Sequence, residues 1–297
     1  MAETNINWTA RPRQFPTGDC KHGLASRCLD TTCERCWRQG FTVNPWLGCV
    51  EKTAACTNCY ARTTATNRMG LDVWGKNKPR EIRVDKAIKE LRRINGAALR
   101  GGQSHRVGVF TGSMCDIFED RDDLAEPRAE YLTAAESVSS VDMMLLTKRP
   151  ENIAGMVPWP SGWPRHIWAG ATIATPGDED DAGHLAVCRA KGAITFASVE
   201  PMLDDGPRPG AWLKSINVCI IGGESGGGAR PFNVDAARRL VAACDDYGTK
   251  VWFKQMGSRW ASKTGRGLLR KGASHGQDPY RWAEWARRRE LPVVGGA

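Results

Sequence analysis

The chain has 297 residues, a formal net charge of +9, 41% hydrophobic residues and 25% charged residues. This composition is typical of a globular protein and excludes a disordered or fibrous chain. No apolar run is long enough to span a membrane, and the first residues lack the apolar core of an export signal. We therefore expect a cytoplasmic protein whose eleven cysteines stay reduced.

A first cysteine group lies within residues 1–40 and consists of Cys20, Cys28, Cys33 and Cys36. The last two have the C-x2-C spacing of a zinc knuckle, and the first two would complete a four-ligand site. The segment is short and poor in core residues, so it would be hard to fold without a metal. We expect a small metal-binding extension with structural zinc. An auxiliary iron–sulfur cluster and unligated thiols are the alternatives.

A second cysteine group follows the predicted strand Phe41–Leu47 and consists of Cys49, Cys56 and Cys59, spaced C-x6-C-x2-C. Three thiolates can hold three irons of a cubane cluster and leave the fourth iron open for a ligand. Zinc with a fourth ligand from elsewhere is the alternative, and ordinary buried cysteines are the least favoured interpretation. Disulfides are disfavoured because the cysteine count is odd and no export signal precedes them.

Helices and strands alternate along the rest of the chain. Helices are predicted over Tyr60–Met69, Asp85–Leu99, Glu126–Val138, Asp180–Lys191 and Val234–Tyr247. Strands are predicted over Val107–Thr111, Met143–Thr147, Ile167–Thr172, Ile194–Val199, Val218–Ile221 and Lys250–Phe253. This alternation predicts a parallel sheet with helical crossovers. Six or seven strands over residues 41–256 favour a partial or complete (β/α) barrel over a doubly wound sheet.

The predicted strands share one feature, which is a reactive residue at the C-terminal end. These residues are Asp116, Lys148, Thr172, Glu200, Glu224 and Lys254. Because α/β barrels build their sites on this rim, we expect the side chains to converge on one mouth, with the cysteine loop at its edge. The alternative is the ordinary polarity of any strand end. Gly222 and Gly223 begin a glycine-rich segment whose backbone could approach a ligand closely, although it matches no phosphate-binding loop.

The C-terminal segment, residues 257–297, is basic and aromatic, as is the end of the barrel before it. Lys250–Glu290 carries eleven Lys and Arg against three Asp and Glu. Cations interleaved with aromatic rings suit a nucleic-acid backbone and its exposed bases. A helix with a solvated basic face and Trp residues in the core is the alternative. The candidate nucleic-acid contacts are Lys254, Arg259, Trp260, Lys263, Arg266, Arg270 and Lys271.

Long motifs in a fixed order carry a family resemblance between Asn44 and Met256. They read NPWLGC, CYA, GSMCDIFED, LLTKRPEN, WAGATI, FASVEPML, IIGGESGGGARPF and VWFKQMG. On them the chain resembles a phage-associated family of three-cysteine-motif proteins, which is itself similar to the radical SAM enzymes. The first gap of six residues departs from the usual C-x3-C-x2-C spacing of those enzymes.

The resemblance implies a partial (β/α) barrel with a 4Fe–4S cluster on Cys49, Cys56 and Cys59. S-adenosylmethionine would bind the open iron, and a reductant such as flavodoxin or ferredoxin would supply an electron. The resulting 5′-deoxyadenosyl radical would abstract a hydrogen atom from the substrate, while the protein orients and shields the reaction. The source would be a phage or a bacterium.

Within this interpretation, residue roles are assigned from positions at the strand ends. The cofactor would be met by Ser113 and Asp116 at its amino group, and by Thr147 and Lys148 at its carboxylate or ribose, with Thr172, Gly222 and Gly223 nearby. Glu200 and Glu224 suit ribose hydroxyls or a substrate base edge, and Lys254 suits a phosphate. Tyr60 is expected to pack over the cluster, with a role as hydrogen relay as the alternative. The catalytic candidates are therefore Lys148, Glu200, Glu224 and Tyr60.

The expected function is that of a radical SAM enzyme acting on a nucleic-acid base, in DNA hypermodification or lesion reversal. DNA is favoured over RNA, and the protein is expected to be a monomer that does not bind a membrane. One alternative is a non-catalytic zinc or iron–sulfur protein that binds nucleic acid. A further alternative is a metal-dependent nuclease using Asp116, Glu200 and Glu224.

Overall fold

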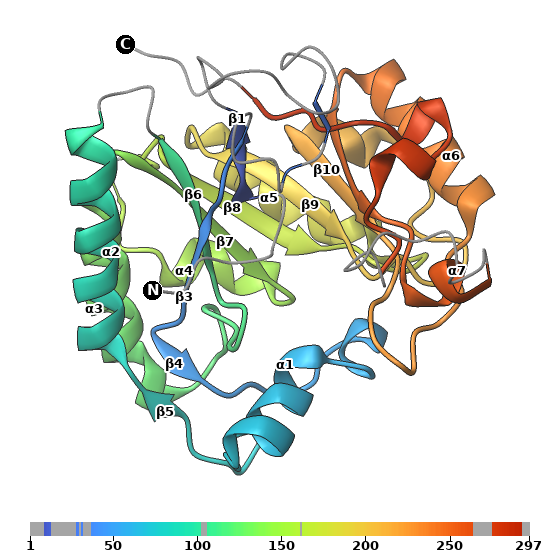
Figure 1. The fold of residues 1–297 in the computed structure, drawn as a ribbon. Helices are drawn as coiled ribbons and strands as arrows, with labels where there is room; N and C mark the ends of the chain where they lie inside the picture. The colour runs from blue at the N-terminus through green and yellow to red at the C-terminus, as the bar shows by residue number, and fades with distance from the viewer. Residues whose placement is uncertain are drawn as a thin grey trace.

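A curled sheet of seven parallel strands forms the centre of the fold (Figure 1). The computed structural model describes residues 9–12, 28–29, 31, 37–101, 106–160, 162–263 and 275–292. The strands are β3 (Phe41–Val43), β6 (Val107–Thr111), β7 (Val141–Thr147), β8 (Ile167–Thr172), β9 (Ile194–Val199), β10 (Val218–Gly222) and β11 (Lys250–Gln255). Each pairs in parallel with the next one in chain order. The predicted (β/α) barrel is therefore confirmed as a half-barrel.

Helices cover the outer face of this half-barrel (Figure 1). They are α2 (Val84–Arg100), α3 (Ala125–Glu136), α4 (Ile153–Met156), α5 (Ala182–Ala190) and α6 (Val234–Tyr247). The amphipathic pattern of α2 explains its position, because Ile88, Leu91 and Ile94 lie on one side of the helix and all are buried. The main hydrophobic core lies between these helices and the sheet. In the described part of the chain, none of the helices is long and apolar enough to cross a membrane.

One predicted strand was wrong in its extent. Phe41–Leu47 is broken into β3 and β4 (Trp46–Leu47), and β4 pairs with β5 (Glu81–Ile82) in a separate antiparallel ribbon. Pro45 lies at the break and has no N–H to donate to a ladder. The chain therefore leaves the barrel after β3 and carries the cysteine loop across its mouth.

The inner face of the half-barrel is filled near the beginnings of the strands. Met144, Trp168, Phe196 and Trp252 form a second buried cluster there with Trp37. The terminal segments close this cluster, because β1 (Arg11–Pro12) and β2 (Trp37–Arg38) form a two-stranded sheet against it. Arg11 stacks over Trp168, and Arg289 stacks over Trp252. The cavity described below lies toward the other end of the strands.

Burial places three of the six aromatic residues of Lys250–Glu290 in the core. Trp252, Phe253 and Trp282 are buried, and Phe253 packs edge-on against Trp282. These three rings belong to the core and cannot stack on bases. Of the N-terminal cysteines, Cys28 is buried beside the Tyr280 hydroxyl, while Cys20, Cys33 and Cys36 lie outside the described residues. The predicted zinc site stays a prediction.

Gly170 in β8 provides a testable point in this inner cluster. A Cβ at this position would overlap the ring of Phe196 on the neighbouring strand. Gly170→Ala is expected to destabilise the protein by about 1–3 kcal/mol, because the ring has to move within a packed core. Urea denaturation measures the change. Gly183→Ala on the exposed face of α5 is the matched control, since a Cβ there meets nothing, and a helix gains about 0.5–1 kcal/mol from it. Equal effects at both sites would contradict this explanation.

Candidate functional site

A cavity of about 630 Å³ lies at the edge where the parallel strands end. Its volume falls in the usual range for ligand pockets, roughly 300–1,000 Å³. The predicted site residues that line it are Cys49, Cys56, Cys59, Tyr60, Ser113, Asp116, Thr147, Lys148, Glu200, Glu224 and Lys254. Residues from five strand ends and the cysteine loop therefore share one pocket.

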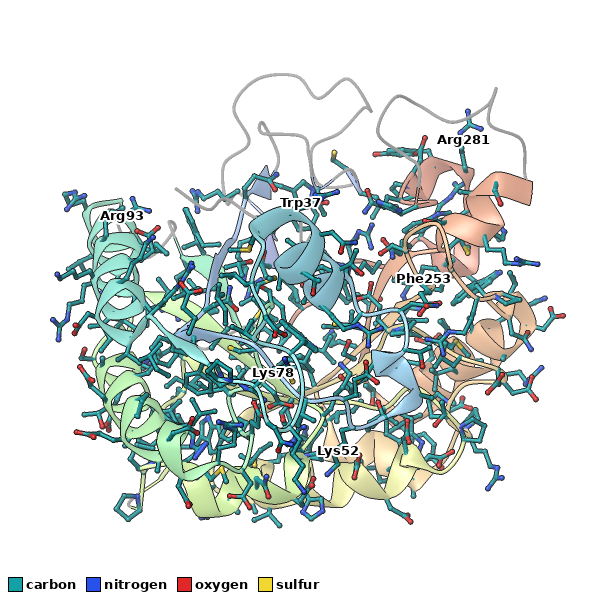
Figure 2. The ribbon with its side chains drawn as sticks, turned by 90° about the horizontal axis from the view of Figure 1, so that it is seen from below. Trp37, Lys52, Lys78, Arg93, Phe253 and Arg281 are labelled. Carbon is teal, nitrogen blue, oxygen red and sulfur yellow. The ribbon has the colours of Figure 1, made fainter. Side chains whose placement is uncertain are left out.

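The cysteine loop is anchored at its start by close backbone packing. Gly48 has φ +112°, and a Cβ there would overlap the Val73 carbonyl oxygen, so only glycine fits. Its N–H donates to the Met114 carbonyl at 3.0 Å. The loop then leads into α1 (Tyr60–Thr63), and Figure 2 shows Lys52 of this loop near the lower edge of the view, below Arg93 of α2 and Phe253 of β11.

The three cysteines offer a donor set for an iron–sulfur cluster but are not gathered as ligands. All three thiols are free and line the same cavity. Among the described residues, no group of three or more Cys, His, Asp or Glu side chains is arranged to hold a metal ion. Burial raises the pKa of Cys49 to about 12, so this thiol is protonated and would lose its proton on binding a metal. The sulfurs fit such a group in chemistry and location, and would have to draw together to bind it.

Asp116 is saturated by hydrogen bonds and acts as a support for its neighbours. Its two oxygens accept from Phe118 N at 3.1 Å, Thr147 Oγ1 at 2.6 Å, Lys148 N at 3.1 Å and Arg149 Nη1 at 2.8 Å. A carboxylate has about four lone-pair positions, so none is left for a ligand. Arg149 also donates to the Val50 carbonyl at 2.9 Å. Asp116 and Thr147 thus hold Arg149, and Arg149 holds the cysteine loop.

Glu224 forms a second support, which we call the Glu224 latch and define as Asn58, Glu224 and Arg230. Asn58 lies between Cys56 and Cys59, and its Nδ2 donates to Glu224 Oε2 at 3.0 Å. Arg230 binds both carboxylate oxygens, at 2.5 and 3.0 Å, and also donates to the Ala54 carbonyl in the cysteine loop. Burial alone would raise the pKa of Glu224, but the hydrogen bonds from Arg230 and Asn58 outweigh it and lower the pKa.

The latch predicts a measurable loosening of the cysteine loop. Glu224→Ala should cost about 1–3 kcal/mol, because it leaves Arg230 and Asn58 without their shared acceptor. Cys56, which is buried, should also react faster with iodoacetamide. Since the Glu224 pKa is lowered by folding, its contribution is present above about pH 4.3 and is lost as the pH falls further.

The control for this prediction is Glu90→Ala. Glu90 makes a similar two-armed pair with Arg93 on the exposed side of α2. An exposed pair contributes about 0–1 kcal/mol, so stability and cysteine reactivity should hardly change. The latch would be refuted if Cys56 alkylation were equally slow in both variants.

The remaining predicted site residues make fewer hydrogen bonds than Asp116 and Glu224. Glu200 Oε1 accepts from Lys254 Nζ at 2.6 Å, and Lys148 Nζ lies 3.4 Å from Thr172 Oγ1. Thr172 is buried and does not line the cavity, so it supports Lys148 from beneath. Tyr60 is 55% exposed, and its hydroxyl donates to the Ser113 carbonyl at 3.1 Å.

The two glycines proposed for the cofactor do not line the cavity. A Cβ on Gly223 would overlap the Met256 carbonyl oxygen, and one on Gly222 would lie 3.4 Å from the Glu200 side chain. The glycines are therefore explained by close packing of β10 against β11 and β9.

The structure describes only part of the predicted nucleic-acid surface. Arg259 is exposed on α7 (Ser258–Lys263), while Trp260 is partly buried and packs against the main core. Lys263 ends α7, and Arg266, Arg270 and Lys271 lie outside the described residues. The role of this segment in binding nucleic acid stays a prediction.

Sequence reasoning missed several residues of the site. Arg149 and Arg230 lie within the motifs LLTKRPEN and GGGARPF, but an arginine after a strand does not reveal its acceptor. Cys115 also lines the cavity, and Gly48 forms a bridge pair with it beside Cys49. Its place in GSMCD, directly before Asp116, was the available signal.

Comparison with known proteins adds a family and no activity. The model of a family described as "Protein of unknown function (DUF5131)" matches residues 33–286. No curated protein matches the chain in sequence. The matched range contains the cysteine loop and all seven strands of the half-barrel.

Proposed function

This chain belongs to the DUF5131 family, and we propose that it is a radical SAM enzyme that acts on a nucleic-acid base. The observation that carries the proposal is the placement of three free thiols from one loop on one cavity at the strand ends of a parallel half-barrel. Strand ends of such sheets are where α/β barrels build their sites. Three thiols on an open cavity suit a cluster that keeps one iron free for a ligand.

The residues divide into ligands and supports. Cys49, Cys56 and Cys59 would hold a 4Fe–4S cluster. Given one electron from an external reductant, the cluster would supply reductive cleavage of S-adenosylmethionine to methionine and a carbon-centred radical, which would take a hydrogen atom from the substrate. Arg149 and the Glu224 latch position the loop on its two sides. Asp116 and Thr147 are assigned to holding Arg149 rather than to the cofactor, because their hydrogen bonds are already used.

Polar groups that still face the cavity suit the cofactor and the substrate. Ser113 lines the cavity, and its hydroxyl is held 3.0 Å from Asn44 Nδ2. Lys148 brings a cation whose only described partner is a threonine hydroxyl, which suits the cofactor carboxylate. Phe110 and Leu146 add apolar surface to the cavity lining, which would help to shield a reactive intermediate from water.

The metal-dependent nuclease is the weaker alternative. Asp116, Glu200 and Glu224 are each paired with a different cation, namely Arg149, Lys254 and Arg230. A divalent metal would have to displace those cations, since hard cations are bound by carboxylate oxygens. A zinc or iron–sulfur protein that only binds nucleic acid remains the second candidate, because the same cysteines would serve it.

One experiment separates the three functions. The protein is reconstituted anaerobically with iron and sulfide, reduced with dithionite and mixed with S-adenosylmethionine. A radical SAM enzyme is expected to release 5′-deoxyadenosine above a protein-free control, as measured by chromatography. A cluster-loaded protein that leaves S-adenosylmethionine intact, with and without DNA, would overturn the proposal. Cleavage of DNA by the protein with a divalent metal ion, in the absence of S-adenosylmethionine, would favour the nuclease.

A further inference from the structure

A polar wall of the cavity has no part in holding the cysteine loop. It is formed by Ser198 and Glu200 from the end of β9, Gln255 and Lys254 from β11, and His275 and Gln277 from the segment that returns over the mouth. We call these six residues the polar wall. Because all six line the same cavity as the cysteines, a molecule bound against them would lie within reach of chemistry at the cysteine loop.

Hydrogen bonds hold this wall in a fixed arrangement. Gln255 Nε2 donates to the Gly223 carbonyl at 2.8 Å, and Gln277 Nε2 donates to Gln255 Oε1 at 3.2 Å. The Gly223 carbonyl thereby orients the Gln255 amide, and the Gln255 amide orients that of Gln277. In the described part of the chain, Glu200 Oε2 and Gln277 Oε1 have no hydrogen-bond partner. They remain as acceptors for a ligand, with the second N–H of Gln277 as a donor.

Apolar residues that line the cavity provide a second kind of contact for a ligand. Phe110 and Leu146 present apolar surface to the cavity, which can pack on the face of a planar ring.

The charges of the wall select among ligands. The Glu200 carboxylate is compensated by Lys254 at 2.6 Å, so the pair carries little net charge. Because the Lys254 cation is already paired with this carboxylate, the pair offers no net positive charge to hold a phosphate. A neutral, flat ring with donors and acceptors along one edge matches both the amides and the apolar surface.

We propose that the polar wall reads the edge of a single nucleobase turned out of its stack, with Gln277 and Glu200 contacting the edge and Phe110 packing on the ring face. This inference rests on the proposed function, because it names the substrate group for the same cavity. Enzymes that act on a base extrude it into such a pocket and read it by hydrogen bonds and stacking. A cavity of about 630 Å³, part of which the cofactor would occupy, is too small for a duplex.

Nucleoside binding tests the inference without turnover. Each of the four deoxynucleosides is titrated into the full-length protein by ligand-observed NMR, with S-adenosylhomocysteine saturating so that the cofactor position is filled. At least one nucleoside is expected to bind, and Gln277→Leu should weaken it about tenfold or more, as expected for losing an amide contact to a base edge. Gln277→Glu should alter the order of preference among the four.

Two controls make the result decisive. Gln39→Leu removes an amide that donates to the Thr31 carbonyl away from the cavity, so nucleoside binding should be unchanged. Deoxyribose 5-phosphate should not compete. The inference is overturned if no nucleoside binds, if Gln277→Leu binds as well as the parent, or if the sugar phosphate competes equally. Binding by a protein that forms no cluster would refute the proposed function and leave this inference standing.

Discussion

Asp142→Ala is expected to destabilise the protein by about 3–5 kcal/mol, the usual cost of removing one partner of a buried ion pair. Asp142 in β7 is 3% exposed and accepts from Arg11 Nε at 2.9 Å and from Arg106 Nη2 at 2.6 Å. The Arg11 side chain is 9% exposed and stacks on Trp168, so it cannot reach water without opening the inner cluster. Domains of this kind are stable by about 5–15 kcal/mol, so much of the margin would be lost.

Urea denaturation followed by tryptophan fluorescence checks this prediction. Asp245→Ala is the matched control, because Asp245 pairs with Arg288 at 2.7 Å but is 53% exposed. Screening by solvent limits that loss to about 1 kcal/mol. Combining Asp142→Ala with Arg11→Met should recover part of the stability, since the buried cation is then gone. If the two aspartate variants unfold at the same urea concentration, the buried pair does not close the inner face as described.

The strands could be predicted because each is a short apolar run ended by turn chemistry. The predicted bounds of β6, β8, β9 and α6 agree with the structure at both ends. In α6 the reasons are local, because Asn233 accepts from Ala236 N at the start and Gly248 has φ +70° at the end. The break after β3 was missed because apolar residues continue on both sides of Pro45, and the proline outweighed them.

The cavity could be predicted more fully than the partners of its residues. Parallel strands bring their ends to one edge, so the convergence of Lys148, Glu200 and Lys254 needs only the order of the strands. Saturation of Asp116 by Arg149 depends on the exact path of the chain after β7. Gln277 joins the cavity from a segment that returns over the mouth, and periodicity carries no sign of that.

Single replacement of Cys49, Cys56 or Cys59 by alanine is expected to abolish the 4Fe–4S cluster. Two thiolates cannot hold three irons, so the visible absorption and the EPR signal of the reduced cluster should vanish after anaerobic reconstitution. Release of 5′-deoxyadenosine should vanish with them. Cys188→Ala in α5 is the matched control, because this cysteine is also free and buried but does not line the cavity.

Cys115→Ala distinguishes a cluster with three cysteine ligands and an open iron from a cluster with four cysteine ligands. Cys115 lines the same cavity as the three loop cysteines, so it is the one described thiol that could serve as a fourth ligand. Its sulfur lies 3.9 Å from Asn44 Oδ1, which also accepts from Met114 N at 2.8 Å, and the side chain is buried. We expect Cys115→Ala to keep the cluster and the cleavage of S-adenosylmethionine. Loss of the cluster in this variant would mean four cysteine ligands and no open iron, and radical chemistry at this site would then be excluded.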